Sequence, residues 1–467
     1  MDISYKELNA DITPEVLGSI SNQKILFESS NGNKTKNRYS ILAFETYGEI
    51  YLNNTRLLIE TENQTQKYTE DIYNQFKKYI DNYFAEVNFA SLEHLPFISG
   101  FIGSFSFDIV RHAYPKLNNI KLEDTSNDAL LHMVESVFVF DHFKEKLYLI
   151  TSNLFSNVSK VELDRRLKKM EDMLKNVRVF ENNIDFKNND KNIVANDTDS
   201  EFIERVKYLK SLIKKGDMYQ VQPSRIYSYK HNFGSLKIPL SYQLYKNLKR
   251  QNPSPYMYYI NMGYDIIVGS SPESFVKTKG NTVVTNPIAG TIKRGKSKEE
   301  DIENEKELLN DEKELSEHRM LVDLGRNDIN QISKLGTMKI QKLMAIEKYE
   351  HLMHIVSEVD GELQDNLSPV DIIMSLLPTG TVSGAPKIRA IQRIYETSPV
   401  KRGIYSGGIG YINCNQDLDF ALAIRTMFID DEYVNVQSAC GVVYDSVPEK
   451  ELEETKLKAR SLLLVEP

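Results

Sequence analysis

The sequence predicts an α+β fold, because strand-like and helix-like patterns follow one another in irregular order along the chain. Before residue 175, short apolar runs alternate with polar turns, which is the pattern of antiparallel strands. After residue 200, further strand-like runs mix with amphipathic helices, without the regular strand–helix alternation of a doubly wound parallel sheet. We therefore expect antiparallel sheets accompanied by helices.

Composition divides the chain into an N-terminal region at 1–175, a linker-like segment at 176–199 and a third region at 200–467. The linker-like segment is rich in Asn and Asp, which favour turns and loops over regular structure. Strands in the N-terminal region are expected at Tyr39–Phe44, Glu49–Leu52 and Ser136–Phe140.

The third region opens with an amphipathic helix that begins near Ser200, a good N-cap residue, and ends at Gly216-Asp217. Its apolar face is formed by Phe202, Val206, Leu209 and Ile213. Later strands are expected at Met218–Tyr229 (bulged at Pro223), Ile266–Val268, Phe275–Thr285, Ile404–Ile412, Leu418–Ile429 and Tyr433–Ser438. Later helices are expected at Ser297–Gly325, Ser368–Leu377, Ser383–Tyr395 and Pro448–Leu464.

Composition excludes several classes of protein. The chain has 467 residues, of which 41% are hydrophobic and 27% charged, as in an ordinary globular protein. A net charge of −8 argues against a nucleic-acid or anionic-membrane partner, since both require a basic surface. There is no signal-peptide pattern and no apolar run of membrane-span length. Cys414 and Cys440 cannot form a disulfide framework, so a cytoplasmic location is expected.

Two carboxylate-rich helices are candidates for binding a cation. In DEKELSEHRMLVDLGRND (311–328), Glu314 and Glu317 fall on one helix face, from which their oxygens can hold a hard cation. Near the C-terminus, Glu451, Glu454 and Lys458 form one narrow helical stripe. Taken alone, either pattern is better explained as a solvated helix face with exposed ion pairs.

Two glycine-bearing turns can bind anions. Pro287–Gly295 (PIAGTIKRG) and Leu376–Lys387 (LLPTGTVSGAPK) both place small residues beside hydroxyls, at the junction of two expected elements. The backbone N–H groups of such turns can bind carboxylate oxygens, although ordinary turn chemistry also accounts for each of them.

These motifs together resemble the chorismate-utilising enzymes, and among them most closely the large subunit (component I) branch of the anthranilate synthases. The resemblance is strong from about residue 200 to 460 and looser before that. It implies a β-sandwich-like core of antiparallel sheets surrounded by helices, with both halves of the chain contributing to one body. The active site would lie in a cleft lined by the C-terminal half.

The resemblance also implies a magnesium site. Glu317 and Glu454 would contact Mg²⁺, with Glu314 and Glu451 in support, and few protein ligands suffice because Mg²⁺ keeps several waters. Metal and Lys458 would neutralise chorismate, which is a dicarboxylate. The other substrate-binding residues carried over from the family are Gly290, Thr291, Gly380, Thr381, Tyr405, Arg425 and Gly441.

Two residues are expected to perform the chemistry. Glu273, in SSPES, matches the family's general acid for the departing C4 hydroxyl, a role that requires a desolvated carboxyl with a raised pKa. His354 lies at the position associated with the later loss of pyruvate. Without the family context, a core histidine with satisfied hydrogen bonds would be the better interpretation of His354.

Two further positions indicate the nucleophile. Gln220 stands where water-adding relatives have a lysine base, and Ala289 stands where aminodeoxychorismate synthases have a lysine. Ammonia is therefore expected to attack C2 directly, giving 2-amino-2-deoxyisochorismate and then anthranilate. The sequence departs from the family's pattern at two positions, with Ala439 in place of a glycine and Ile226 in place of a basic residue. If the backbone at Ala439 requires a positive φ, alanine would cost about 1 kcal/mol there.

Ammonia supply and regulation follow from the same resemblance. The chain lacks a glutaminase's Cys-His-Glu set, so a separate glutamine amidotransferase subunit (component II) is expected, in a heterotetramer. Two segments, LFESS and NPSPYM, resemble those that form the family's tryptophan pocket, and they predict feedback inhibition. The residues concerned are Glu28, Ser29, Asn252, Pro253, Pro255, Tyr256 and Met257. An aminodeoxychorismate synthase or a catalytically silent tryptophan-binding paralogue are the alternatives.

Overall fold

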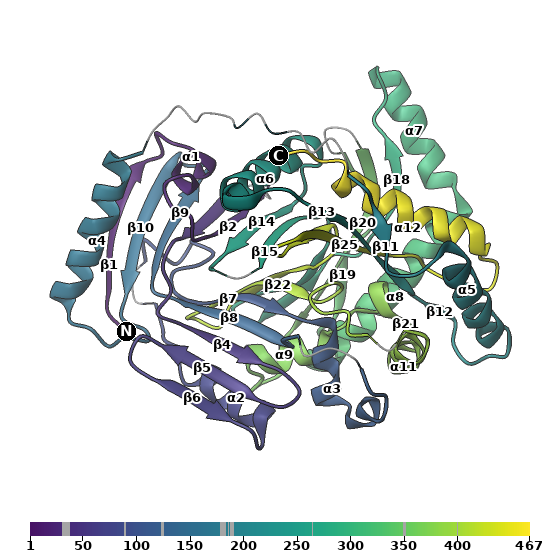
Figure 1. The fold of residues 1–467 in the computed structure, drawn as a ribbon, viewed down its shortest axis with the longest axis horizontal. Coiled ribbons are helices and arrows are strands. Elements are labelled where there is room, and N and C mark those ends of the chain that lie inside the picture. Colours follow the sequence, from purple (N-terminus) through teal and green to yellow (C-terminus); the bar gives the residue numbers. More distant parts are fainter. Residues whose placement is uncertain are drawn as a thin grey trace.

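Two large antiparallel sheets form the centre of the computed structural model, which describes residues 1–29, 38–87, 90–122, 126–177, 184, 186, 191–263, 265–348, 352–398 and 400–467 (Figure 1). The first sheet, sheet A, has the order β1 (Ile3–Asn9), β10 (Lys146–Ser152), β9 (Ser136–Asp141), β3 (Tyr39–Ala43), β2 (Lys24–Glu28), β14 (Tyr256–Asn261), β15 (Ile266–Ser271), β24 (Thr426–Ile429), β25 (Tyr433–Ala439), β13 (Ser224–Lys230) and β11 (Val194–Ala195).

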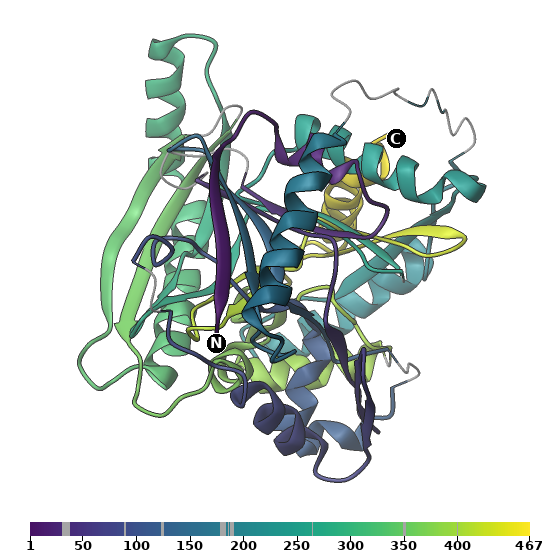
Figure 2. The same cartoon turned by 90° about the vertical axis from the view of Figure 1, so that its left-hand side faces the viewer.

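The second sheet, sheet B, has the order β18 (Ile288–Lys293), β20 (Leu352–Glu362), β17 (Thr282–Thr285), β16 (Ser274–Lys279), β23 (Leu418–Leu422), β22 (Gly408–Asn413), β7 (Gly100–Phe105), β8 (Ala129–Val134), β4 (Gly48–Leu52), β5 (Leu57–Thr61) and β6 (Thr65–Tyr68). β19 (Lys339–Lys348) pairs with β20, and the resulting long hairpin runs along one edge of the molecule (Figure 2). A separate two-stranded sheet joins β12 (Gln220–Val221) to β21 (Gly384–Ala385).

The helices are α1 (Pro14–Gly18), α2 (Ile72–Asp81), α3 (Val110–Ala113), α4 (Lys160–Lys175), α5 (Asp199–Lys214), α6 (Lys237–Gln251), α7 (Lys298–Asn310), α8 (Glu312–Ile332), α9 (Pro369–Leu376), α10 (Gly380–Ser383), α11 (Lys387–Thr397) and α12 (Pro448–Leu463). Short 3₁₀ turns are η1 (Phe107–Ile109), η2 (Pro115–Asn119) and η3 (Gly234–Leu236). Among the described residues, no helix is both long and apolar enough to cross a membrane. Cys414 and Cys440 are free, buried thiols.

The main hydrophobic core lies between the two sheets. It combines buried residues of sheet A, such as Ile25 and Ile41, with buried residues of sheet B, such as Ile50 and Leu131. A second core covers the other face of sheet A, where α4, α6 and α12 pack on the strands. Helix α8 covers β18, β20 and β17 of sheet B. The α+β prediction, with antiparallel sheets surrounded by helices, is confirmed.

Both halves of the sequence contribute strands to both sheets. β14 lies between β2 and β15 in sheet A, and β7 lies between β22 and β8 in sheet B. The division of the chain at residues 175 and 200 stays a prediction, and much of the linker-like segment lies outside the described residues.

Some helix boundaries differ from those expected. The first helix of the third region is capped by Thr198 instead of Ser200, because the Thr198 hydroxyl accepts the Glu201 N–H (3.2 Å) while the Glu201 carboxylate accepts the Thr198 N–H (2.8 Å). The long helix expected at Ser297–Gly325 is interrupted at Asp311, whose extended backbone ends α7 and whose carboxylate caps α8 through the Glu314 N–H (3.2 Å).

Gly325 was expected to end this helix, and that expectation is wrong, since α8 continues to Ile332. The glycine instead permits close packing, because a Cβ at this position would lie only 3.2 Å from Pro287 Cγ. The helix expected from Ser383 begins at Lys387, after α10 and the short β21. In contrast, α9 and α12 begin and end within one residue of the predicted limits, and Ser368 caps α9 as expected.

Several runs expected to be single strands are two strands. Met218–Tyr229 is divided at Pro223 into β12 and β13, and Phe275–Thr285 is the β16–β17 hairpin with a turn at Gly280. Leu418–Ile429 is divided between sheets, with β23 in sheet B and β24 in sheet A. The chain changes sheet at Arg425, which has a left-handed φ of 50°.

Candidate active site

Glu273 lies where the chain passes from β15 in sheet A to β16 in sheet B. The Thr381 hydroxyl donates a hydrogen bond to the Glu273 carboxyl (3.0 Å), and the Glu273 carbonyl accepts the Leu422 N–H (3.0 Å). Burial raises the pKa of Glu273 to about 7, although the Thr381 hydrogen bond and the charge of Lys458 both lower it. A pKa near neutrality suits a group that gives up a proton as a general acid.

The turn that carries Thr381 is supported by α8. Gly380 lies against Leu324, so that a Cβ on Gly380 would come within 2.8 Å of a leucine methyl group. Thr379 and Thr381 share a hydrogen bond of 2.8 Å between their hydroxyls. A small void of about 20 Å³ lies between this turn, α8 and Glu273. The apolar residues of the 311–328 motif thus bring the second glycine turn to the proposed acid.

The first glycine turn lies within the β18–β20 pair. Gly290 has a φ of 76° at a bulge, and a Cβ there would lie 2.9 Å from Ile355 Cδ1, so both backbone and space require glycine. Thr291 pairs with His354 in the strand register, while its side chain lies outside the described part of the structure. Burial lowers the pKa of His354, the backbone of Gly290 raises it, and the nearby Arg425 lowers it further.

Arg425 stands at the second crossing between the sheets. Its carbonyl accepts the Ser270 N–H (3.0 Å), which ties this crossing to the one that carries Glu273. Within the described residues, the Arg425 guanidinium makes no hydrogen bond or ion pair. Although the side chain keeps access to solvent, surrounding protein lowers its pKa by desolvation. An unengaged arginine near His354 is well suited to hold a carboxylate.

Lys458 brings α12 to the same place. Its ammonium donates to the Ala439 carbonyl (3.0 Å) and to the Glu454 carboxylate (2.6 Å). Burial opposes its charge, but Glu454 and the buried hydroxyl of Tyr405 raise the pKa of Lys458. Lys458 also acts electrostatically on Glu273, so the predicted residues Tyr405, Lys458 and Glu273 are neighbours.

Gly441 lies beside the segment that carries Gln220. A Cβ at Gly441 would be 3.1 Å from the Gln220 amide nitrogen and 3.2 Å from that of Gln222. Ala439, which replaces an expected glycine, ends an extended strand opposite Ser224, so the anticipated cost of positive φ does not arise. Ile226 is likewise an ordinary strand residue, opposite Gln437.

The carboxylates expected to hold magnesium lie on two helices. Among the described residues, no three acidic, histidine or cysteine side chains are gathered closely enough to hold a metal by themselves. Glu451 nevertheless has a buried Oε2 with no hydrogen-bond partner in the described part of the chain, and burial, together with Glu454, raises the pKa of Glu451. A nearby cation would interact with this Oε2 atom and would favour the charged form of the carboxylate. The carboxylate oxygens of α12 therefore fit Mg²⁺, with water completing its coordination shell. Glu317 is exposed on α8.

The two segments expected to form the tryptophan site are adjacent. β2 pairs with β14, so that Glu28 is opposite Met257. Glu28 is buried and accepts hydrogen bonds from Tyr245 (2.5 Å) and Lys249 (2.9 Å); burial raises its pKa against the effect of Lys249. Ser29, Asn252, Pro253 and Pro255 are partly buried, and Tyr256 donates to Asp419 (3.0 Å). Ser30 lies outside the described residues.

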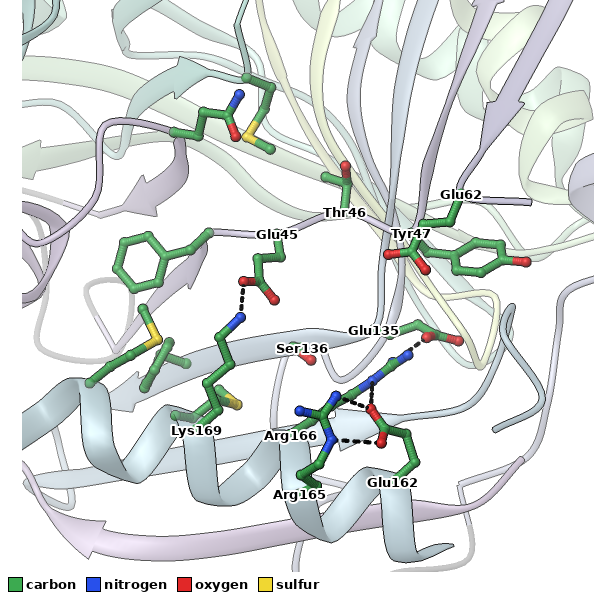
Figure 3. A pocket seen from close by; sticks show the side chains of 16 residues that line it. Glu45, Thr46, Tyr47, Glu62, Glu135, Ser136, Glu162, Arg165, Arg166 and Lys169 are labelled. Atoms are coloured by element: carbon green, nitrogen blue, oxygen red, sulfur yellow. Dashed lines mark hydrogen bonds and ion pairs between the residues drawn. The ribbon is translucent and has the colours of Figure 1, made fainter. Parts of the chain in front are cut away.

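A cavity of about 540 Å³ lies elsewhere, between α4 and the loop after β3 (Figure 3). Three ion pairs lie in its lining: Arg165 with Glu162 (2.7 Å), Arg166 with Glu135 (2.7 Å) and Lys169 with Glu45. None of the predicted site residues lines it. It is therefore separate from the arrangement around Glu273.

Comparison with known proteins defines the class. A model of the chorismate binding enzyme family matches residues 23–464, and the chain belongs to that family. It is an enzyme that acts on chorismate. The anthranilate synthase component 1 proteins of Acetivibrio thermocellus and Lactococcus lactis are each 39% identical to it, over 94% and 98% of this chain and 89% and 99% of their own length.

Solved structures agree on the architecture. The anthranilate synthase component I of Streptococcus pneumoniae matches with a TM-score of 0.80 at 36% identity, covering 91% of this chain and 92% of its own. The menaquinone-specific isochorismate synthase MenF of Escherichia coli has the same fold, with a TM-score of 0.70 over 99% and 95% of the two chains at 16% identity.

The structure also reveals residues that the sequence did not single out. Arg402 is buried beside the turn of Thr381, and Asp328 forms a buried ion pair with Lys387 (2.7 Å) on the edge of the small void. Arg402 belongs to the RGIYSGG run that also holds Tyr405, but no spacing in that run distinguishes a buried arginine from an exposed one.

Proposed function

We propose that the chain is the large subunit of an anthranilate synthase, which converts chorismate and ammonia to anthranilate and pyruvate through 2-amino-2-deoxyisochorismate. The observation that carries this proposal is the protonatable Glu273 carboxyl, with a pKa of about 7, held by Thr381 and close to Lys458. A second support is Gln220, a buried amide at the position where water-adding relatives have a lysine base.

In the first step, Glu273 donates its proton to the departing C4 hydroxyl, which leaves as water while the ammonia lone pair forms the bond to C2. The added nitrogen then releases a proton, which can restore Glu273. Because Gln220 cannot act as a base at neutral pH, a neutral nucleophile that needs no deprotonation, such as ammonia, is favoured over water.

In the second step, His354 accepts the C2 proton as the bond from C3 to the enolpyruvyl oxygen breaks. Protonation of the released enolpyruvate gives pyruvate, and the ring becomes aromatic. Burial lowers the pKa of His354 and so favours the neutral ring, the form that can accept a proton.

Substrate binding is assigned to cationic and backbone groups. Arg425 and Lys458 would hold carboxylates, the turns at Gly290-Thr291 and Gly380-Thr381 would supply N–H groups, and Tyr405 and Gly441 would shape the site. Mg²⁺, when bound by Glu317 and Glu454 with Glu314 and Glu451 in support, would supply positive charge next to a substrate carboxylate.

The proposal includes a cytoplasmic glutamine amidotransferase partner as the source of ammonia and feedback inhibition by tryptophan. Component 1 in the relatives' names supports a partner component. The β2–β14 pairing of Glu28 with Met257 supports a regulatory site, because it joins the two segments that resemble the family's tryptophan pocket. Unchanged activity at saturating tryptophan would contradict this regulatory role.

The direct test is incubation of the purified chain with chorismate, Mg²⁺ and concentrated ammonium. Anthranilate is followed by fluorescence and the products are identified by mass. We expect anthranilate and pyruvate, both abolished by chelation. Formation of aminodeoxychorismate would instead identify the alternative synthase, and intact chorismate with tryptophan still bound would identify a silent regulator.

A further inference from the structure

Arg402 is a buried arginine between two segments of the candidate active site. The residue is 5% exposed, and its guanidinium lies 4.6 Å from the centre of the Phe107 ring. Its Nη1 donates to the Val382 carbonyl (2.9 Å) and its Nη2 donates to the Gln222 carbonyl. One side chain thus joins the turn after Thr381 to the strand after Gln220.

The two segments are also joined through their backbones. β12 pairs with β21, the Gln222 N–H donates to the Ser383 carbonyl (3.1 Å), and Val221 forms a bridge with Val442 on its other side. β12 is therefore the middle strand between the turn of Thr381 and the turn of Gly441. Because the pairing is only two residues long, the backbone bonds alone define its geometry poorly.

Arg402 therefore acts on Glu273 through a short chain of contacts. Val382 follows Thr381 directly, and the Thr381 hydroxyl donates to the Glu273 carboxyl (3.0 Å). Moving the Val382 carbonyl would move this hydroxyl as well. On the opposite side, moving Gln222 would shift Gln220, whose buried side-chain oxygen has no hydrogen-bond partner among the described residues.

The N-terminal half holds Arg402 in place. Besides the stacking on Phe107, the Gly403 N–H donates to the Asp108 carboxyl (2.8 Å), which also accepts from the Tyr395 hydroxyl (2.8 Å). Asp108 is completely buried, and its hydrogen bond fixes the backbone of residue 403, next to Arg402. Among the described residues, Arg402 Nε has no hydrogen-bond partner, so the guanidinium is held by the Val382 and Gln222 carbonyls and by the Phe107 ring.

We propose that Arg402 is a positioning residue that sets the distance between the Thr381 turn, which holds the proposed acid Glu273, and the Gln220 strand on the side of the nucleophile. The kinetic consequences of this role rest on the proposed function. The guanidinium suits it because its fork reaches two carbonyls at fixed separation, which a lysine ammonium cannot reproduce.

Arg402→Lys and Lys401→Met form a matched pair for testing this role. Lys401 is the adjacent buried cation, 4% exposed, but its partners are Asp128 and the Ser126 carbonyl, which lie outside the site. Both substitutions are expected to lower the melting temperature. Only Arg402→Lys is expected to lower kcat/KM for chorismate, by about ten- to a hundredfold, and to shift the pH limb set by Glu273.

A second measurement is independent of turnover. In hydrogen exchange followed by mass spectrometry, peptides covering 219–222 and 379–385 should exchange at least about tenfold faster in Arg402→Lys than in the wild type, and not in Lys401→Met. Equal exchange in these peptides, or equal kinetic losses in both variants, would overturn the role of Arg402. If the wild type made no anthranilate, the proposed function would fail, while the exchange comparison would still decide the positioning role.

Discussion

Glu273 and Arg425 lie on neighbouring crossings between the two sheets, and two backbone hydrogen bonds join these crossings. The Leu422 N–H donates to the Glu273 carbonyl, and the Ser270 N–H donates to the Arg425 carbonyl, each at 3.0 Å. The crossings exist because β15 pairs with β24 in sheet A while β16 pairs with β23 in sheet B. A proton donor and a cation are thereby held on rigid strand ends, which favours a fixed geometry in the site.

Replacing Glu273 by glutamine should remove the acidic proton and keep the size and shape of the side chain. We expect Glu273→Gln to reduce anthranilate formation by at least about a hundredfold, because an amide cannot protonate the leaving hydroxyl. Chorismate affinity, measured by equilibrium binding, should stay within about threefold of the wild type.

A buried carboxyl without this role provides the control. Asp328 is paired with Lys387 on the edge of the same small void, and Asp328→Asn should lower the rate by less than about tenfold. Equal losses in both variants would show that Glu273 acts only through the local packing.

The hydrogen bond from Thr381 to Glu273 should shift the pH at which kcat declines. Glu273 must be protonated to act, so activity should decline as the pH rises through about 7. The Thr381 hydroxyl stabilises the carboxylate and lowers the pKa of Glu273, so Thr381→Val should move the declining limb to higher pH. Thr379→Val, which removes only the neighbouring hydroxyl, should leave the limb unchanged, and a limb moving to lower pH would contradict the assignment.

Glu273 should also lower the stability of the protein at alkaline pH. Its pKa is about 7 in the folded state against 4.5 in the unfolded chain, so the unfolded state releases its proton first as the pH rises. The free energy of unfolding should therefore fall between about pH 4.5 and 7. Glu273→Gln, measured by urea denaturation, should be more stable than the wild type by about 3 kcal/mol at pH 8 and equally stable at pH 4.

Gly290 should tolerate no side chain. Gly290→Ala combines a positive φ with a Cβ 2.9 Å from Ile355, and should cost about 2–3 kcal/mol together with most of the activity. Gly336 has nearly the same φ, 79°, but no atom within 4 Å of its Cβ position, so Gly336→Ala should cost about 1 kcal/mol and preserve kcat/KM. Similar kinetics in the two variants would remove Gly290 from the site.

The sequence predicted those features that depend on local chemistry. The Ser368-Pro369 start of α9 and the apolar face that begins with Phe202 follow from capping and helical periodicity, and both are present. The positions of Glu273 and Thr381 were expected only through family resemblance, since the two residues are far apart in sequence. Glu273 lies between β15 and β16, and Thr381 lies in α10.

Other features could not be predicted from local patterns. Gly325 has the sequence signature of a helix end, yet tertiary packing against Pro287 keeps it inside α8. The apolar run Leu418–Ile429 reads as one strand because both parts are buried, and only the change of sheet at Arg425 separates them. Arg402 gave no signal, because burial of a charge depends on partners from Val382 and Gln222, which come from other parts of the chain.

Each sheet contains strands from both halves of the chain, and this has a consequence for synthesis on the ribosome. β2 and β7 have open edges until β14 and β22 have emerged, because these late strands are their direct neighbours. Nascent chains therefore expose unpaired backbone and apolar faces for most of translation, which invites misassociation between neighbouring polysomal chains. We therefore expect overexpression to depend on chaperones and truncated fragments to be recovered poorly.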